Sequence, residues 1–297
     1  MHNKKYVAFM EATGVIAYNM TNNYMFRFIL QKNKKVLKGL VCALLHLKPE
    51  EIKKIEILNP INLSGDVTGK EFILDIHVLL NDNTQINLEM QNVNEYNWTD
   101  RSLSYLCRTF DQLYKGQEYD EARPVVHIGF LDFTLFPKYP EFYATYKMLN
   151  VRNYHLYSDK FVLSVLNLNR IDLATEEDKA YEIDYWARLF KARTWEELKE
   201  LVKDNEYLQE AADSIYKANA DEIVRQQCRA REEAERRERT LEREIKLLSD
   251  EKAGLKEKVE SLEDENSGLK DKIGGLEDKY AKLQAELERL KKKYNEE

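Results

Sequence analysis

The sequence predicts a mixed α/β domain, followed by helices and then by a C-terminal parallel coiled coil. Three observations support this fold class. Two strand-like segments with a polar turn between them occupy residues 72–91, an apolar strand-like segment spans 124–132, and leucine recurs every seven residues from Leu241 to Leu290. We expect three regions, which are an α/β domain over 1–174, a helical extension over 175–228 and a coiled coil over 229–297 with its heptads at 241–294.

The composition indicates a folded protein of a reducing compartment. The 297 residues include 18 Tyr, 11 Phe and 3 Trp, most of them before residue 200, which excludes disorder for the first two thirds of the chain. The three cysteines show no CxxC spacing, so we expect neither disulfides nor a zinc site. Neither a signal peptide nor an apolar run of about 20 residues is apparent, so we expect a cytoplasmic protein with no membrane partner.

The net charge is −7, with acidic and basic residues mixed along the chain. A protein that binds nucleic acid through bulk positive charge is therefore excluded. Any contact with DNA must be local, built from a few basic side chains and a bound cation.

The predicted elements follow in order along the chain. Apolar residues recur near helical spacing through residues 22–47, so we expect one helix there, ended by Pro49. The later elements are a strand over 55–58, a loop over 62–69, a helix over 95–115 ended by Gly116, a strand over 124–132 and a strand within 154–173. Helical sequence then begins at Thr175, and both Thr175 and Thr194 start capping boxes.

The segment 72–91 predicts a hairpin with acidic residues on one face. Asn81 to Thr84 has the composition of a turn, and the second strand alternates strictly between polar and apolar residues. Paired strands would bring Asp75 and Glu89 together, and like charges repel unless a cation or a proton separates them. The spacing by itself favours an ordinary solvated face, but Asp75 interrupts an apolar strand, where a lone charge is costly.

The tail predicts a parallel two-stranded coiled coil. Leucine fills all eight d positions from Leu241 to Leu290, and Asn266 at an a position favours the same register. A solvated single helix is the alternative, and the unbroken leucine series argues against it. Five facing g and e positions carry opposite charges in a parallel homodimer, namely Glu251 with Lys256, Lys258 with Glu263, Glu265 with Lys270, Lys272 with Glu277 and Glu286 with Lys291.

Several strings resemble one family when they are taken together. They are Thr21-Asn-Asn-Tyr-Met-Phe-Arg27, Lys70-Glu-Phe-Ile-Leu-Asp75, Ile86-Asn-Leu-Glu-Met-Gln91, Trp98-Thr-Asp-Arg-Ser-Leu-Ser-Tyr105, Gly116-Gln-Glu-Tyr119 and Pro124-Val-Val-His-Ile-Gly-Phe-Leu-Asp-Phe133. This pattern resembles the PD-(D/E)XK nuclease family transposases, the Rpn-type recombination-promoting nucleases, over residues 20–230. The resemblance implies a restriction-endonuclease-like core with a mixed sheet flanked by helices, and metal-dependent cleavage of DNA.

The resemblance also implies site residues. Asp75 and Glu89 would bind Mg²⁺ or Mn²⁺. Gln91 occupies the position of the superfamily lysine, and Asn23 the position of an aspartate, so both are carried over as catalytic positions. An alternative role for Asn23 is a helix cap, which asparagine fills well.

Two further residues of the matching strings are candidates for phosphate contact. Arg101 and Tyr105 lie one turn apart on the predicted helix and could face the site; the alternative is a surface salt bridge and a core tyrosine. His77 shares the predicted face of Asp75, and without a second histidine at ligand spacing we expect a packed polar residue.

Two functions therefore remain open. The first is a homodimeric Mg²⁺-dependent DNA endonuclease of the recombination-promoting type, with the zipper joining two nuclease modules. The second is a catalytically weak or inactive nuclease fold that serves as a protein-interaction module, motivated by Asn23 and the acidic net charge.

Overall fold

In the computed structural model, the residues described are 8–58, 61–62, 72–73, 75–94, 96–113, 116–202 and 205–294. The chain divides into two compact units, Met1–Glu232 and Glu233–Glu297. The predicted loop over 62–69 lies, apart from Asn62, outside the described residues. Over the described part of the chain, no helix is long and apolar enough to span a membrane.

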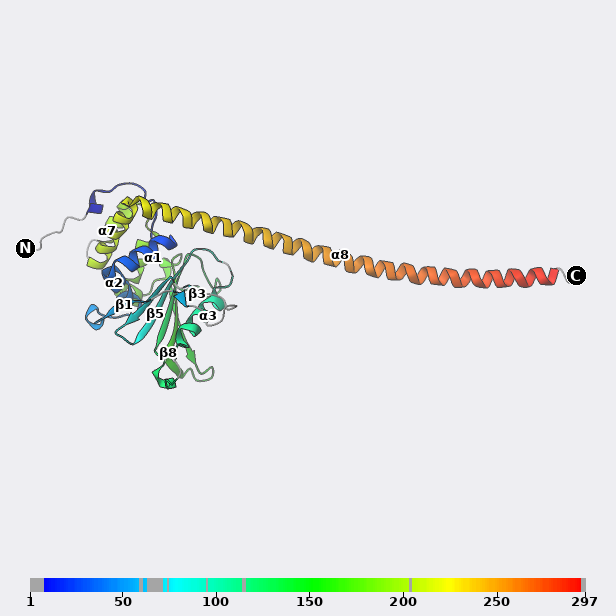
Figure 1. Ribbon diagram of the computed structural model, residues 1–297, viewed down its shortest axis with the longest axis horizontal. Coiled ribbons are helices and arrows are strands. Elements are labelled where there is room, and N and C mark those ends of the chain that lie inside the picture. The colour runs from blue at the N-terminus through cyan, green and yellow to red at the C-terminus, as the bar shows by residue number, and fades with distance from the viewer. Residues whose placement is uncertain are drawn as a thin grey trace, which may run out of the picture. The chain divides into compact units, whose positions relative to one another are not determined.

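A six-stranded mixed sheet lies at the centre of the first unit (Figure 1), in the order β1-β4-β5-β6-β8-β7. The strands are β1 Ile55–Ile57, β4 Ile76–Leu80, β5 Thr84–Gln91, β6 Val125–Leu131, β7 Tyr143–Leu149 and β8 Leu156–Asn167. β5, β6 and β8 run parallel, whereas β1, β4 and β7 pair antiparallel with their neighbours. Two short strands, β2 Ile61–Asn62 and β3 Phe72–Ile73, form a separate ladder. The predicted mixed sheet is confirmed, although β7 was not among the predicted strands.

The predicted hairpin forms, but its first strand is interrupted. β4 pairs antiparallel with β5, and Asn81 and Asp82 of the turn take φ values of 51° and 59°, which a type I′ turn requires. The expected single strand over 72–80 is wrong, because Phe72 and Ile73 pair with β2 and the chain bends at Asp75 before β4 begins. The chain thus pairs with β2 before Asp75 and with β5 after it.

The predicted single helix over 22–47 is also wrong, because Asn33 divides it into α1 Asn23–Lys32 and α2 Lys34–Leu44. The Asn33 backbone is extended, with its N–H donating to Ile29 O, while its side chain accepts from Lys35 N at 3.1 Å. One asparagine therefore ends the first helix and caps the second. Its side-chain amide also donates to Ser214, so packing against another helix fixes the break.

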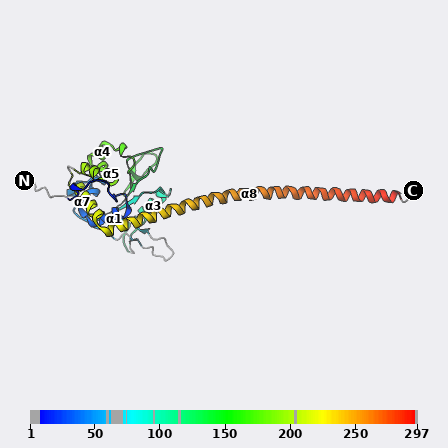
Figure 2. The same ribbon diagram turned by 90° about the horizontal axis from the view of Figure 1, so that it is seen from above.

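The remaining helices of the first unit are α3 Trp98–Phe110, α4 Glu176–Ala180, α5 Ile183–Lys191, α6 Trp195–Leu201 and α7 Glu206–Ala220. Figure 2 shows α4 and α5 next to each other. Both predicted capping boxes are confirmed. The side chains of Thr175 and Thr194 each accept a hydrogen bond from the N3 backbone N–H, and the N3 carboxylate accepts one from the threonine backbone N–H. The predicted end of the third helix at Gly116 is wrong: α3 stops at Phe110, and Gly116 lies beyond it with φ +96°.

The two faces of the sheet have different chemistry. On one face, Leu88 of β5 joins the main core with Phe26 of α1 and Phe190 of α5. On the other face, α3 covers the polar side chains of β5. Trp98 of α3 forms a smaller hydrophobic cluster there with Leu131 and Val165. Helices of the predicted 175–228 extension thus share a core with the sheet, and the division into three regions stays a prediction. In Figure 1, α1 and α2 lie on one side of β5 and α3 on the other.

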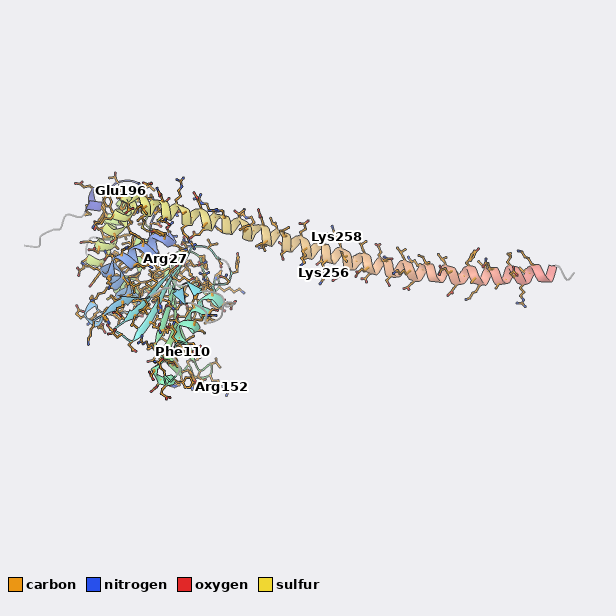
Figure 3. All side chains as sticks on the ribbon, in the orientation of Figure 1. Arg27, Phe110, Arg152, Glu196, Lys256 and Lys258 are labelled. Carbon is orange, nitrogen blue, oxygen red and sulfur yellow. The ribbon has the colours of Figure 1, made fainter. Side chains whose placement is uncertain are left out.

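The second unit belongs to one continuous helix, α8 Glu222–Tyr294, which begins in the first unit. Its side chains project along the whole length (Figure 3). All eight d-position leucines, from Leu241 to Leu290, are more than half exposed, with 55% the lowest value. The helix therefore presents an apolar seam that a single copy of the chain leaves open, and the predicted pairing of two copies stays a prediction.

Candidate active site

Asp75 and Glu89 lie at the same end of the β4–β5 hairpin. Its ladder ends with the pair of Ile76 and Leu88, and Asp75 and Glu89 are the next residues beyond that pair. The Asp75 Oδ2 atom accepts a hydrogen bond from Met90 N at 3.0 Å, which fixes the carboxylate beside β5. The hairpin thus places Asp75 and Glu89 at the same end of β4 and β5, and their joint binding of a cation stays a prediction.

Glu89 is almost fully buried and contacts two other polar groups. Arg101 Nε lies 2.7 Å from Glu89 Oε1, and His127 Nε2 lies 3.5 Å from Glu89 Oε2. Glu89 pairs in the ladder with Gly129 of β6, over which the Trp98 indole is seated. A side chain at position 129 would occupy the space of the indole, so Gly129 allows α3 to approach the sheet beside Glu89.

His127 is fully buried between aromatic rings. Its ring centroid lies 5.8 Å from Trp98 and 6.0 Å from Tyr105. Burial, helped by the positive charge of Arg101, lowers the pKa of His127 to about 3. The imidazole is therefore neutral near pH 7, and its 3.5 Å approach to Glu89 is a dipolar contact rather than an ion pair.

Sequence reasoning gave His127 no role. The available signal was the period of two in Val125–Leu131, which places His127 and Gly129 on the same face of the strand. The register with β5 then sets that face against Asn87 and Glu89.

Asp75 lies in an electropositive but desolvated setting. Burial raises the pKa of Asp75, while the hydrogen bond from Met90 N and the positive charges of Arg27, Arg101 and Arg231 oppose that rise. These three arginines come from α1, α3 and the first turns of α8, all within the first unit. Arginine side chains from three helices therefore stabilise the charged form of the Asp75 carboxylate.

Asn23 is the first residue of α1 and is not its cap. Asn22 fills that role, since its side chain accepts from the N–H groups of Tyr24 and Met25. The cap interpretation of Asn23 is therefore wrong. Its Oδ1 atom is buried and accepts no hydrogen bond, and Asn23 lies one turn before Arg27 on the same helix face.

The remaining candidates are Arg101 and Tyr105 of α3 and His77 of β4. Arg101 faces the site rather than forming a surface salt bridge, and its guanidinium lies 5.3 Å from the centroid of the Tyr105 ring. Tyr105 is buried, so its contact with phosphate stays a prediction. His77 is packed as expected, with Nε2 3.0 Å from Gln85 Oε1.

A scan against family models matches residues 20–244 to the PD-(D/E)XK nuclease family transposases. The chain belongs to this family. The match covers both strands of the hairpin, α3 and β6, and extends into α8. Neither a search of curated proteins nor a search of solved structures gives a match.

Gln91, two residues after Glu89, lies within the matched range, and its place at the lysine position of the family stays a prediction. Its side chain is buried on the face that carries Glu89, and Nε2 donates to Val93 O at 3.1 Å. An amide there can orient a neighbouring group by hydrogen bonds but adds no positive charge. In this member of the family, the positive charge beside Glu89 comes from Arg101.

The donor set suits a hard divalent cation. Asp75 and Glu89 supply carboxylate oxygens, and Asn23 Oδ1 is a buried oxygen that accepts no hydrogen bond from the described residues. In the described part of the chain no group of three or more His, Cys, Asp or Glu side chains is arranged to hold a metal ion. Mg²⁺ keeps several of its water ligands when it binds a protein, so two carboxylates, an amide oxygen and water suit it, and a complete set of protein ligands is not needed.

Proposed function

We propose that this family member is a Mg²⁺- or Mn²⁺-dependent DNA endonuclease that acts as a homodimer. The observation that carries the proposal is the position of Asp75 and Glu89, which directly follow the last pair of the hairpin ladder, with Arg27 and Arg101 adding positive charge at Asp75. Two acidic residues and nearby guanidinium groups are what a phosphodiester-cleaving site needs. Membership of a nuclease family supports the same reaction class.

Each residue has a separate task in this proposal. Asp75 and Glu89 would hold the cation, which, when bound, polarises the scissile phosphate and acidifies a water molecule. Arg101 neutralises Glu89 in the cation-free protein and binds a phosphate oxygen of DNA, since guanidinium pairs well with phosphate. Gln91 would orient the attacking water by hydrogen bonding, and Asn23 would offer its buried Oδ1 atom, which accepts no hydrogen bond from the described residues, to the cation or to its water.

Dimerisation through α8 is the second part of the proposal. The exposed leucine seam runs over about 54 residues, which is on the order of 80 Å of helix. An apolar seam of this length is stable in water only when it is covered, and the complementary g and e charges favour a second copy in parallel orientation. Two nuclease modules then act on the two strands of one duplex.

The dimer is tested by the mass of the protein in solution. Leu269→Glu introduces a charge at a d position, and we expect it to shift the mass measured by light scattering from two chains toward one. Ser267→Glu is the matched control, because position 267 is a b position on the outer face of the heptad. A wild-type protein of one-chain mass would contradict the dimer.

The nuclease activity is tested by plasmid nicking with Mg²⁺ or Mn²⁺ and with EDTA. Asp75→Asn and Glu89→Gln keep the side-chain shape and remove the charge, so each should reduce the rate at least ~100-fold. Asp82→Asn is the control, since Asp82 is an exposed acidic residue of the same hairpin that pairs with Lys54. Cleavage that is unaffected by EDTA or by Asp75→Asn would refute the proposal.

The inactive interaction module is the second candidate, favoured by Asn23 in place of an acidic residue. Isothermal titration with Mn²⁺ separates the two functions. Heat that is saturable in the wild type and absent in Asp75→Asn supports the nuclease. Absence of binding in the wild type and in Asn23→Asp, together with no cleavage by either, supports the interaction module.

A further inference from the structure

The hairpin of β7 and β8 extends beyond the sheet as an arm. β6 pairs with β8 only from Phe161 onward, so the preceding residues of β8 pair with β7 alone among the described residues. Residues 145–157 are exposed without interruption, and we call this segment the arm. Figure 3 shows Arg152 of the arm far from Arg27, which lies by the candidate active site.

The base of the arm is fixed in place. Lys160 Nζ donates to the backbone oxygens of Asp120 and Ala122 at 2.8 and 2.9 Å, and the Phe161 ring packs edge-on against Phe110 of α3 at 5.7 Å. The tip is also ordered by backbone hydrogen bonds, since Asn150 and the 154–155 segment bond to each other. The arm is a built projection rather than a loose loop.

The chemistry of the arm differs from the rest of the chain. Residues 145–157 contain Lys147, Arg152 and His155 and no acidic residue, although the whole chain has a net charge of −7. Tyr154 and Tyr157 are 75% and 80% exposed. A change of register between β7 and β8 leaves Tyr157 outside the ladder, and Tyr154 takes a left-handed φ of 58°.

We propose that the arm binds single-stranded DNA, with Tyr154 and Tyr157 stacking on bases and Lys147 and Arg152 contacting phosphates. Exposed aromatic rings next to basic side chains are the features that bind single strands without sequence preference. Because no acidic residue of the arm cancels the charges of Lys147 and Arg152, the arm gives a polyanion a favourable place on an otherwise acidic chain. The proposal rests on DNA being the substrate of the nuclease, but it does not require that cleavage occurs.

The arm and the active site are separate surfaces. The ladder pairs Glu89 with Gly129, and Gly129 with Val165 of β8. The nine residue steps from Val165 to Leu156 correspond to about 30 Å of strand at 3.3 Å per residue. The arm would therefore hold unpaired DNA well away from the bond that is cut.

The test measures binding of a fluorescently labelled 20-residue oligo(dT) to the full chain by anisotropy, in EDTA so that cleavage plays no part. We expect Tyr154→Ala and Tyr157→Ala each to weaken binding about 5- to 150-fold, and Tyr157→Phe to retain it. Lys147→Ala with Arg152→Ala should reduce the slope of log Kd against log salt by about 1.4, the loss of two phosphate contacts.

The matched control is Tyr185→Ala with Arg188→Ala, which removes one exposed tyrosine and one exposed arginine from α5 outside the arm. It should bind like the wild type. The proposal is overturned if the wild type fails to bind oligo(dT), if the arm variants bind it normally, or if they change the oligomeric mass instead. Plasmid cleavage distinguishes the two failures, since Mg²⁺-dependent cleavage with arm-independent binding refutes only the arm, and arm-dependent binding without cleavage refutes only the nuclease.

Discussion

The close approach of α3 to the sheet at Gly129 gives a sharp test of the site's architecture. A Cβ atom at position 129 would lie 2.0 Å from Trp98 Cζ2 and 2.4 Å from Cη2, whereas ordinary contacts begin at 3.4 Å. In Gly129→Ala the indole must therefore move by roughly 1.4 Å. Trp98 is the first residue of α3, so its displacement also moves Arg101, one turn later, away from Glu89.

The energetic cost can be bounded from this geometry. Overpacking of a core costs typically ~1–3 kcal/mol. Replacing a strand glycine with alanine recovers about 0.5–1 kcal/mol of backbone entropy. At the upper end of the overpacking cost, the net loss in the free energy of unfolding of the first unit is about 2 kcal/mol, or roughly 4–8 °C in Tm for a unit of this size.

Differential scanning calorimetry and the plasmid assay measure the two consequences. Gly129→Ala should unfold at lower temperature and cleave more slowly, because Trp98 and Arg101 move together. Gly254→Ala is the control, since no atom lies within 4 Å of its added Cβ in α8, and alanine should favour that helix by up to ~1 kcal/mol. Wild-type stability and cleavage in Gly129→Ala would refute the seating of Trp98 over Gly129.

Three further predictions follow from single residues. Since burial lowers the pKa of His127 to about 3, the folded protein keeps its neutral imidazole, and the free energy of unfolding falls as the pH drops from 6.5 toward 3. His127→Gln should therefore reduce by about 2 kcal/mol the difference between the free energies of unfolding that urea titrations give at pH 8 and at pH 5. An unchanged difference would contradict the burial of the ring. Burial raises the pKa of Cys228 to about 12 and also raises the pKa of Cys42, whereas Cys107 is exposed, so at pH 8 a thiol reagent should label Cys107 alone until the protein is denatured. Rapid labelling of Cys228 would show that the start of α8 is not packed within the first unit. Asn33→Ala should cost about 1–2 kcal/mol in urea unfolding, because it removes the cap of α2 and leaves its side-chain contacts to α7 unmade, and a cost near zero would show that the break does not depend on the cap.

The sequence was sufficient where one local pattern dominated. Strict alternation in β5 predicted which residues face the core, and Leu88 lies there while Glu89 lies on the other face. The Asn-Asp turn predicted the hairpin, since both residues tolerate positive φ. Thr175 and Thr194 predicted helix starts because the capping hydrogen bonds are local in sequence.

Tertiary contacts decided the features that the sequence could not predict. A break at Asn33 has little local signal, since the helical spacing of apolar residues continues across it, and its partners on α7 are about 180 residues away. The partner change at Asp75 depends on β2, which pairs with Phe72 and Ile73. The burial of His127 depends on α3 and β5, neither of which is near it in sequence.

The two carboxylates of the candidate site are balanced differently, and this bears on how a cation would bind. Glu89 has its counter-charge in direct contact, with Arg101 Nε at 2.7 Å, so a cation must compete with a guanidinium for that carboxylate. Asp75 has only a backbone hydrogen bond and more general positive charge to offset its burial, and its pKa is raised. A bound cation would offset the burial of the Asp75 carboxylate, which raises its pKa, whereas at Glu89 it would take the place of Arg101, which in the proposed nuclease then contacts phosphate. In the proposed nuclease, Arg101 would thus neutralise Glu89 in the absence of a cation and bind DNA in its presence.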